Sequence, residues 1–256
     1  MKIDIQMISP YLHKQELSQE NHWIYQYTQG TQSILPHRQE VVQTLLKELA
    51  AYPKSFPIFN PTLITKLFPN YKNILDDIIL LPIVGASASF DCGIIQQDGK
   101  NYLLIDLLHV ADYTPIVSQM TYILHNMVHI QLLQYLMKLV FPAPKTFMEQ
   151  LESIFFIDGF AQYLAWNKDC ATYSLQSKTY KKDKDRCFPF LYQILTIQDS
   201  SNQKHILKQL QDADLWDNFV LASAIFFLDD IYQKMQEKGL YACYAHGPKD
   251  IFKLVF

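Results

Sequence analysis

The sequence has few cysteines, and no two of them form a paired motif. Cys92, Cys170, Cys187 and Cys243 stand far apart and form no CxxC, which argues against a disulfide framework and a cysteine zinc knuckle. Positive and negative charges nearly balance, since the chain has 22 basic and 25 acidic residues and a net charge of -3. No basic field therefore indicates nucleic acid or an anionic membrane as a partner.

We expect neither a signal peptide nor a membrane-spanning segment in this sequence. Charged and apolar residues alternate over 1–15, without the continuous apolar core of a signal peptide. The most apolar run, 122–141, has about the length of a membrane span, roughly 20 residues. It carries two His, an Asn, two Gln and a Lys, each of which is costly in lipid. We expect a helix buried in protein and, with the scattered cysteines, a reduced cytoplasmic chain.

Motifs for phosphate, dinucleotide or serine-nucleophile chemistry are absent as well. The chain contains no GxxxxGK, no GxGxxG and no GxSxG. Its hydrophobic content of 49% with only 18% charged residues is sufficient for a buried core. The 16 Tyr and 16 Phe are spread along the chain, so we assign them to that core and not to a surface that stacks on bases.

Hydrophobic periodicity predicts strands and short helices in the first part of the chain. Residues 3–7 alternate between apolar and polar, as in a strand with one buried face. Apolar residues recur at helical spacing over 38–51, and the four prolines of 53–71 predict short helices and turns. The apolar run 78–84 predicts a strand, with Pro82 near its end or at a sheet edge.

A tight hairpin is the clearest β signal. Asp98-Gly99 separates two strand-like runs within 93–106, and glycine accepts the positive φ that two-residue hairpin turns require. With the first strand, this hairpin predicts a small and mostly antiparallel N-terminal sheet. The fold class we expect is α+β, with the sheet followed by a mainly α-helical C-terminal part.

From Thr114 onward the pattern is helical. Thr114 can cap a helix whose first position is Pro115, and the prolines after Phe141 must end it. Beyond that turn the sequence predicts a helix at 146–166, a solvated charged loop at 178–186, and further helices at 188–197, 201–212 and 217–238, the last stopped by Gly239. Without repeats or a long linker, we expect one domain, 1–256, with sublobes 1–113 and 114–256, the second carrying the candidate site.

Two histidines, His125 and His129, are the main candidates for chemistry. Residues four apart on a helix lie one turn above each other on the same face, so both imidazoles can face one metal ion. The spacing is equally compatible with two hydrogen-bonded core histidines, because HxxxH arises by chance in a chain with eight histidines.

The next helix offers a third ligand. Counted from the proline turn, His129 and Asp158 both lie about 17 Å away at 1.5 Å rise per residue. Antiparallel packing therefore predicts that Asp158 comes level with His129, and Gln162 with His125. Gly159 interrupts a helical segment at a cost of about 1 kcal/mol relative to alanine. We expect it to permit close approach of another helix, either at a ligand site or in ordinary packing.

HNMVH at 125–129 and DGFAQY at 158–163 together resemble the gluzincin branch of zinc metallopeptidases. They are most similar to small bacterial proteins described as predicted zinc-dependent proteases, in which HExxH is followed by a helix bearing EGxAxY. The resemblance covers roughly residues 75–170 and implies a zincin-like fold. It also implies that His125 and His129 are zinc ligands, that Asp158 takes the place of the third-ligand glutamate, and that Asn126 takes the place of the general base.

Two of these positions depart from the family pattern. Aspartate remains an anionic oxygen ligand at Asp158, whereas the amide of Asn126 cannot take a proton from zinc-bound water. General acid-base assistance contributes about 10²- to 10⁴-fold to rate, so Asn126 predicts weak or absent peptidase activity. His246, with Tyr241 and Tyr244 nearby in the sequence, is the candidate for a replacement base or oxyanion donor.

Three functions stay open at this point. The first is a degenerate metallopeptidase-like protein, a pseudoenzyme that binds zinc, a peptide or another protein. The second is an active metallohydrolase that uses a base from elsewhere in the chain. The third is a helical interaction protein without metal, whose histidines belong to its core. Two imidazoles and a carboxylate also suit iron, cobalt or nickel, and the sequence does not fix the oligomeric state.

Overall fold

The computed structural model describes residues 1–13, 22–28, 38–56, 58–87, 90–166, 175, 178–213 and 215–256. The chain forms two compact units, the first from Met1–Pro57 and Asn70–Leu132 and the second from Ile58–Pro69 and Leu133–Phe256. The division falls within helix α7 (Val117–Val140), whereas the expected sublobes divide after residue 113. The α+β class expected from the sequence is confirmed.

The first unit contains a four-stranded sheet. Its strands are β1 (Lys2–Ile3), β2 (Ile78–Ile83), β3 (Cys92–Gln97) and β4 (Lys100–Asp106), in the order β1-β2-β4-β3. β2 pairs in parallel with β1 and with β4, and only β3 and β4 are antiparallel. The prediction of a mostly antiparallel sheet is therefore wrong. The hairpin strand β3 lies at the edge, which leaves β4 to pair with β2, and local patterns do not encode that strand order.

The proline of β2 is placed where a missing N–H has no consequence. Leu80 O accepts a hydrogen bond of 2.9 Å from Asp4 N, so the backbone groups of Leu80 point toward β1. Residues two apart on a strand point their backbone N–H and C=O groups to the same side. Pro82 therefore faces the side of β1, which pairs only with Ile79 and Leu80. Pro82 lies near a strand end, as predicted, although β2 is an inner strand.

The hairpin between β3 and β4 is confirmed. Gln97 pairs with Lys100, and the two residues between them, Asp98 and Gly99, have φ of 50° and 73°. Positive φ at both central residues is the geometry that matches the twist of a two-residue hairpin.

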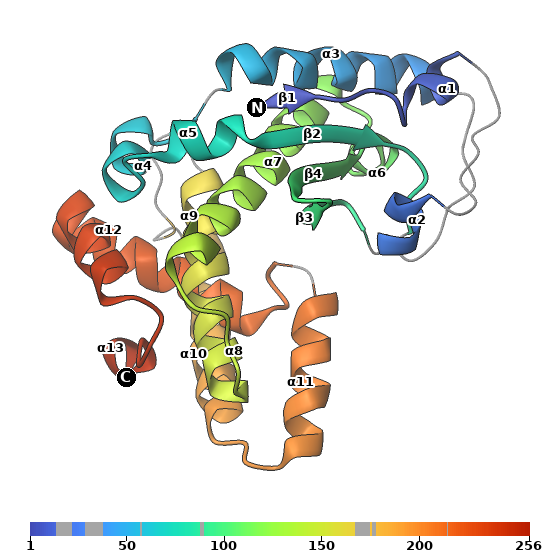
Figure 1. The fold of residues 1–256 in the computed structure, drawn as a ribbon. Helices are drawn as coiled ribbons and strands as arrows, with labels where there is room; N and C mark the ends of the chain where they lie inside the picture. Colours follow the sequence, from blue (N-terminus) through green and yellow to red (C-terminus); the bar gives the residue numbers. More distant parts are fainter. Residues whose placement is uncertain are drawn as a thin grey trace. The chain divides into compact units, whose positions relative to one another are not determined.

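Helices cover both faces of this sheet. Leu81, Ile83 and Leu104 form one apolar cluster with Ile24 of α2 (Trp23–Tyr27) and with Ala86. The alternate strand residues, including the buried Leu80 and Leu103, point to the opposite face. Helix α3 (Gln39–Ser55), predicted at 38–51, contacts β1 and α6 and lies along the sheet in Figure 1.

Among the described residues, four more helices belong wholly or partly to the first unit. They are α1 (Ser9–Leu12), α5 (Tyr71–Asp76), α6 (Leu107–Asp112) and the first part of α7. Helix α7 begins at Val117, two residues later than the predicted start at Pro115, and Thr114 Oγ1 accepts a hydrogen bond of 3.2 Å from Ile116 N in the turn before it. In the described ranges, no helix combines the length and the apolar character that crossing a membrane requires.

The second unit is helical. It contains α4 (Pro61–Leu67), the end of α7, α8 (Phe147–Ser153), the π-helix η2 (Ile154–Asp158), α9 (Gly159–Trp166), α10 (Lys178–Leu195), α11 (Ser200–Asp212), α12 (Phe219–His246) and α13 (Phe252–Val255). Within this unit α12 packs against α4, η2, α9 and α10. The predicted helix at 146–166 corresponds to α8, η2 and α9 in succession.

Two sequence predictions in this unit are wrong. Residues 178–186 are not a loop but the first half of α10, which buries Cys187 and pairs Lys184 with Asp230 at 2.6 Å. The charges occupy one face of an amphipathic helix, which a count of charged residues does not distinguish from a loop. Helix α12 also continues past Gly239 to His246, and its regular geometry is interrupted at Gln236, where φ is 55°.

Gly159 permits close packing of two helices. A Cβ added there would lie 2.5 Å from Ala224 Cβ on α12, well inside van der Waals contact. The expected close approach is thus confirmed, and the neighbour is α12 in ordinary helix packing.

We predict that Gly159→Ala destabilises the protein by about 1–3 kcal/mol, because an overpacked helix contact strains both backbones. Urea unfolding of the parent, Gly159→Ala, Ala224→Gly and the double variant measures the effect as a double-mutant cycle. The double variant should recover stability beyond the sum of the single changes. Additive effects would contradict the close contact.

Candidate functional site

The two predicted ligand histidines lie together in the first unit. His125 and His129 come from successive turns of α7, and their ring centroids are 5.7 Å apart with the planes at 57°. The two residues are 6% and 2% exposed. The helix thus presents both imidazoles on one buried face, as the HxxxH spacing predicts.

Aromatic side chains from the end of α3 cover this pair. Phe56 stacks on His125 with centroids 5.1 Å apart and meets His129 edge-on at 5.6 Å. Tyr52 approaches His125 edge-on at 5.8 Å. The surroundings of the two rings are therefore largely apolar, and burial raises the pKa of Tyr52 so that its hydroxyl stays protonated.

This environment holds the imidazole of His129 neutral. Burial, together with repulsion from a charge on His125, lowers the pKa of His129 from 6.5 to about 3. A neutral imidazole has the lone pair that a transition metal requires. It is also the form that a core histidine adopts in apolar surroundings.

Asn126 stands between these histidines in the sequence and is partly buried. Its Oδ1 is buried and accepts no hydrogen bond from the described residues. Leaving such an atom without a partner costs roughly 1–3 kcal/mol. The amide has no proton to exchange near neutral pH, so it cannot act as a general base.

Asp158, the expected third ligand, belongs to the second unit and ends the π-helix η2. Gln134 Nε2, near the end of α7, donates a hydrogen bond of 2.8 Å to Asp158 Oδ1. Burial raises the pKa of Asp158 to about 6, although the charge of Lys138 and the bond from Gln134 oppose this. On α7, the observed hydrogen-bond partner of this carboxylate is thus the amide of Gln134. The π-helix that carries Asp158 is a feature often found at functional sites.

The candidate replacement groups near the C-terminus have local contacts. His246 is exposed at the end of α12, and its Nδ1 lies 3.0 Å from Gly247 O. The hydroxyl of Tyr241 donates to Glu237 Oε2 at 3.1 Å. Tyr244 packs in an aromatic cluster with Phe68, Phe141, Phe156 and Phe160. Each of these contacts is accounted for by packing within the second unit.

A complete metal site is not formed by the described part of the chain. There, no group of three or more His, Cys, Asp and Glu side chains is arranged to hold a metal ion. The two neutral imidazoles fit a transition metal as a donor pair. We therefore assign only His125 and His129 as candidate ligands and derive no hydrolytic step from them.

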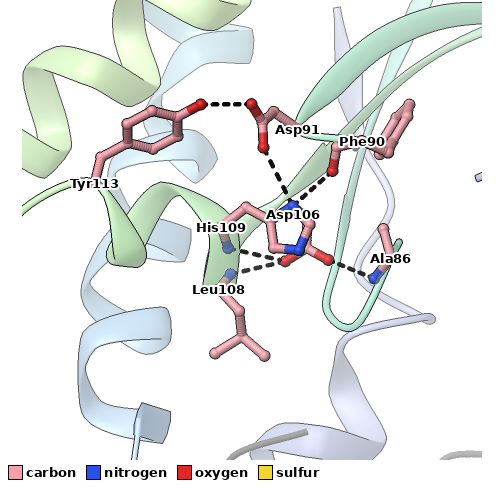
Figure 2. Close-up of polar contacts among 7 residues, drawn as sticks. All are labelled: Ala86, Phe90, Asp91, Asp106, Leu108, His109 and Tyr113. Carbon is pink, nitrogen blue, oxygen red and sulfur yellow. Dashed lines mark hydrogen bonds and ion pairs between the residues drawn. The ribbon is translucent and has the colours of Figure 1, made fainter. Parts of the chain in front are cut away.

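A second polar cluster, in the first unit, centres on Asp106 and is shown in Figure 2. Asp106 is 0% exposed, ends β4 and caps α6. Its Oδ1 accepts hydrogen bonds from Leu108 N at 2.8 Å and His109 N at 3.3 Å, and its Oδ2 accepts one from Ala86 N at 2.6 Å. Burial raises the pKa of Asp106, although these backbone donors oppose the change.

His109 extends this cluster toward the surface. Its Nδ1 lies 2.7 Å from Phe90 O and 3.2 Å from Asp91 Oδ1, and the Tyr113 hydroxyl donates to Asp91 Oδ2 at 2.6 Å (Figure 2). The bond to Asp91 raises the pKa of His109 in spite of burial. Burial alone would raise the pKa of Asp91, but the bonds from His109 and Tyr113 lower it.

This cluster fixes the segment between β2 and β3 at both of its ends. Asp106 holds Ala86, and His109 holds Phe90 and Asp91, so α6 is attached to the chain on either side of that connection. Its groups are engaged with one another, and we assign it a structural role. These residues were not among the candidates predicted from the sequence, although an aspartate between a strand and a helix is a recognisable N-cap signal.

Comparison with known proteins adds no relative. No protein-family model, no curated protein and no solved structure matches this chain significantly. The candidate site is therefore interpreted from its own residues.

We predict that His109 makes stability depend on pH above 6.5. Its pKa is raised in the folded protein from the ordinary 6.5, so its contribution is present below pH 6.5 and is lost as pH rises through the raised value. Each pH unit between the two pKa values contributes about 1.4 kcal/mol to the free energy of unfolding.

Urea unfolding from pH 6 upward, in steps of about half a unit, measures this slope as a difference between parent and His109→Asn. His129→Asn is the matched control, because the pKa of His129 is lowered and its contribution changes only below pH 6.5. Equal slopes for the parent and His109→Asn above that pH would rule out the assignment.

Proposed function

We propose that this protein is a degenerate relative of zinc metallopeptidases that binds a transition metal ion through His125 and His129 but hydrolyses peptides poorly or not at all. The observation that carries the proposal is a pair of buried imidazoles on one face of α7, with an amide in the sequence position that the family reserves for its general base.

The surroundings of the pair support metal binding in particular. His129 is neutral at pH 7 because its pKa is lowered to about 3, so it need not lose a proton before it binds a metal. When bound, a metal ion of this class acts as a Lewis acid. His125 and His129 would hold it, and the hydrophobic cover of Phe56 would limit access of water.

Weak or absent hydrolysis follows from two further observations. Asn126 provides no proton acceptor for catalysis, and its Oδ1 is buried without a described donor. The family resemblance assigns the third-ligand place to Asp158, whose carboxylate accepts a hydrogen bond from Gln134. With two protein ligands we expect weaker metal affinity than a three-ligand zinc site has.

We also propose a cytoplasmic location, and a peptide or protein as the partner of the site.

We predict that the purified parent binds Zn²⁺ with one saturable site and that His129→Ala loses this binding. Isothermal titration with Zn²⁺ and metal analysis after dialysis measure it. Phe56→Ala keeps both imidazoles and removes their cover, so it should bind with unchanged or higher affinity and faster association.

His109→Ala is the matched control, since it removes a buried histidine outside the pair. Circular dichroism shows whether each variant folds. Stoichiometric zinc in His125→Ala/His129→Ala, or none in the parent, would favour the third reading, in which the histidines belong only to the core.

Asn126→Glu restores the missing carboxylate and tests the remainder of the proposal. We expect the parent to show at most trace metal-dependent turnover of a peptide library. Asn126→Glu should exceed that level by about 10²- to 10⁴-fold, the usual contribution of general acid-base assistance. Asn126→Gln, equal in size but uncharged, is the control and should stay inactive.

Other outcomes distinguish the alternatives. Metal-dependent turnover by the parent, abolished by His129→Ala, would support an active metallohydrolase with a base from elsewhere, and loss in His246→Ala would identify that base. A silent Asn126→Glu variant that still binds zinc would show a metal site without a peptidase scaffold.

A further inference from the structure

The second unit contains a pocket whose lining does not include His125 or His129. It has a volume of about 480 Å³, within the range of about 300–1,000 Å³ that small-molecule sites occupy. Its walls are the proline turn between α7 and α8, one side of α8, and the segment that follows α12. Its lining includes Pro142, Pro144, Met148, Glu152, Pro248 and Lys249.

The walls of this pocket are held in place by local structure. At the start of α8, Thr146 Oγ1 accepts a hydrogen bond from Glu149 N at 3.2 Å, and Glu149 Oε2 accepts one from Thr146 N at 3.0 Å. On the other wall, Gly247 has φ of 79° and packs so closely that an added Cβ would lie 3.2 Å from Phe141. A preformed pocket loses little conformational freedom when a ligand binds.

Glu152 is the buried charged group of this lining. Glu152 is 8% exposed, whereas neighbouring lining residues such as Pro144 and Lys249 are exposed. Its Oε1 accepts a hydrogen bond of 2.7 Å from Asp250 N. No ion pair between Glu152 and a cation is formed within the described ranges, in which Asp250 pairs with Lys253 at 3.0 Å.

A buried carboxylate in this situation favours a cationic ligand. Burial raises the pKa of Glu152, the bond from Asp250 N opposes this, and the charges of Asp250 and Glu149 raise it further, against a lowering by Lys249. Burying a carboxylate without a cationic partner is costly. A ligand ammonium or guanidinium would supply that partner through a charge-assisted hydrogen bond.

We propose that this pocket binds a small basic molecule with an aliphatic stem, whose ammonium or guanidinium group pairs with the carboxylate of Glu152. The rings of Pro142, Pro144 and Pro248 and the side chain of Met148 offer apolar surface to the methylene groups of such a stem. Lys145 and Lys249 also line the pocket, which suits a ligand carboxylate at its other end. L-Arginine has all three features.

Titration of the full chain with L-arginine, followed by calorimetry or ligand-observed NMR, tests the proposal. L-Citrulline is the matched probe, because it has nearly the same shape and no cationic group. We expect saturable binding of L-arginine and at least about tenfold weaker binding of L-citrulline, equivalent to about 1.4 kcal/mol. Equal binding of the two, or no saturable binding of L-arginine up to about 10 mM, would overturn the proposal.

Two variants locate the binding. Glu152→Gln keeps a carbonyl that can accept from Asp250 N but removes the charge, and it should lose at least about tenfold in affinity for L-arginine. Met148→Trp places a larger side chain in the same lining but leaves the charge of Glu152 unchanged, and it should weaken binding too. Glu48→Gln, the same change at an exposed position in the first unit, should bind as the parent does. Thermal unfolding verifies that each variant is folded, and full affinity in folded Glu152→Gln would exclude Glu152 as the anchor.

Discussion

The carboxylate of Asp106 connects the sheet of the first unit to the helices that follow it. It ends β4, caps α6 through Leu108 N and His109 N, and holds Ala86 beyond β2. A carboxylate with no exposed surface is tolerated only when hydrogen bonds replace its lost hydration, and three backbone donors do so here. The direction in which the chain leaves β4 toward α6, and then α7, is set at this residue.

The contact between His109 and Asp91 holds the other end of the segment between β2 and β3 against α6. Because the aspartate before α6 and the histidine within it act on opposite ends of the segment between β2 and β3, the cluster functions as one network and not as separate caps. Such buried networks are valuable when every member is satisfied and costly when one is lost.

The histidine pair and the polar cluster differ in what their surroundings do to a proton. Apolar rings around His125 and His129 disfavour the charged imidazole and lower the pKa of His129. A carboxylate beside His109 favours the charged form and raises its pKa. The imidazole of His129 is thus kept neutral, with a lone pair to donate, whereas that of His109 is favoured in its protonated form, although both residues are buried. This contrast is why the metal hypothesis rests on α7.

Local patterns in the sequence determined the Asp98-Gly99 hairpin, the end of α7 at the prolines and the shared face of His125 and His129, since each depends on residues within a few positions. The order of the strands, the helical state of 178–186 and the partner of Asp158 were decided only by tertiary structure. β4 pairs with β2 because β3 takes the edge; α10 is helical because Cys187 and Leu191 have a core to enter; and Asp158 meets Gln134 through the packing of helices. Counting residues from a turn predicts which residues of two antiparallel helices lie side by side only when both helices are regular α-helices. The π-helix at Ile154–Asp158 is not a regular α-helix, so the count does not apply there.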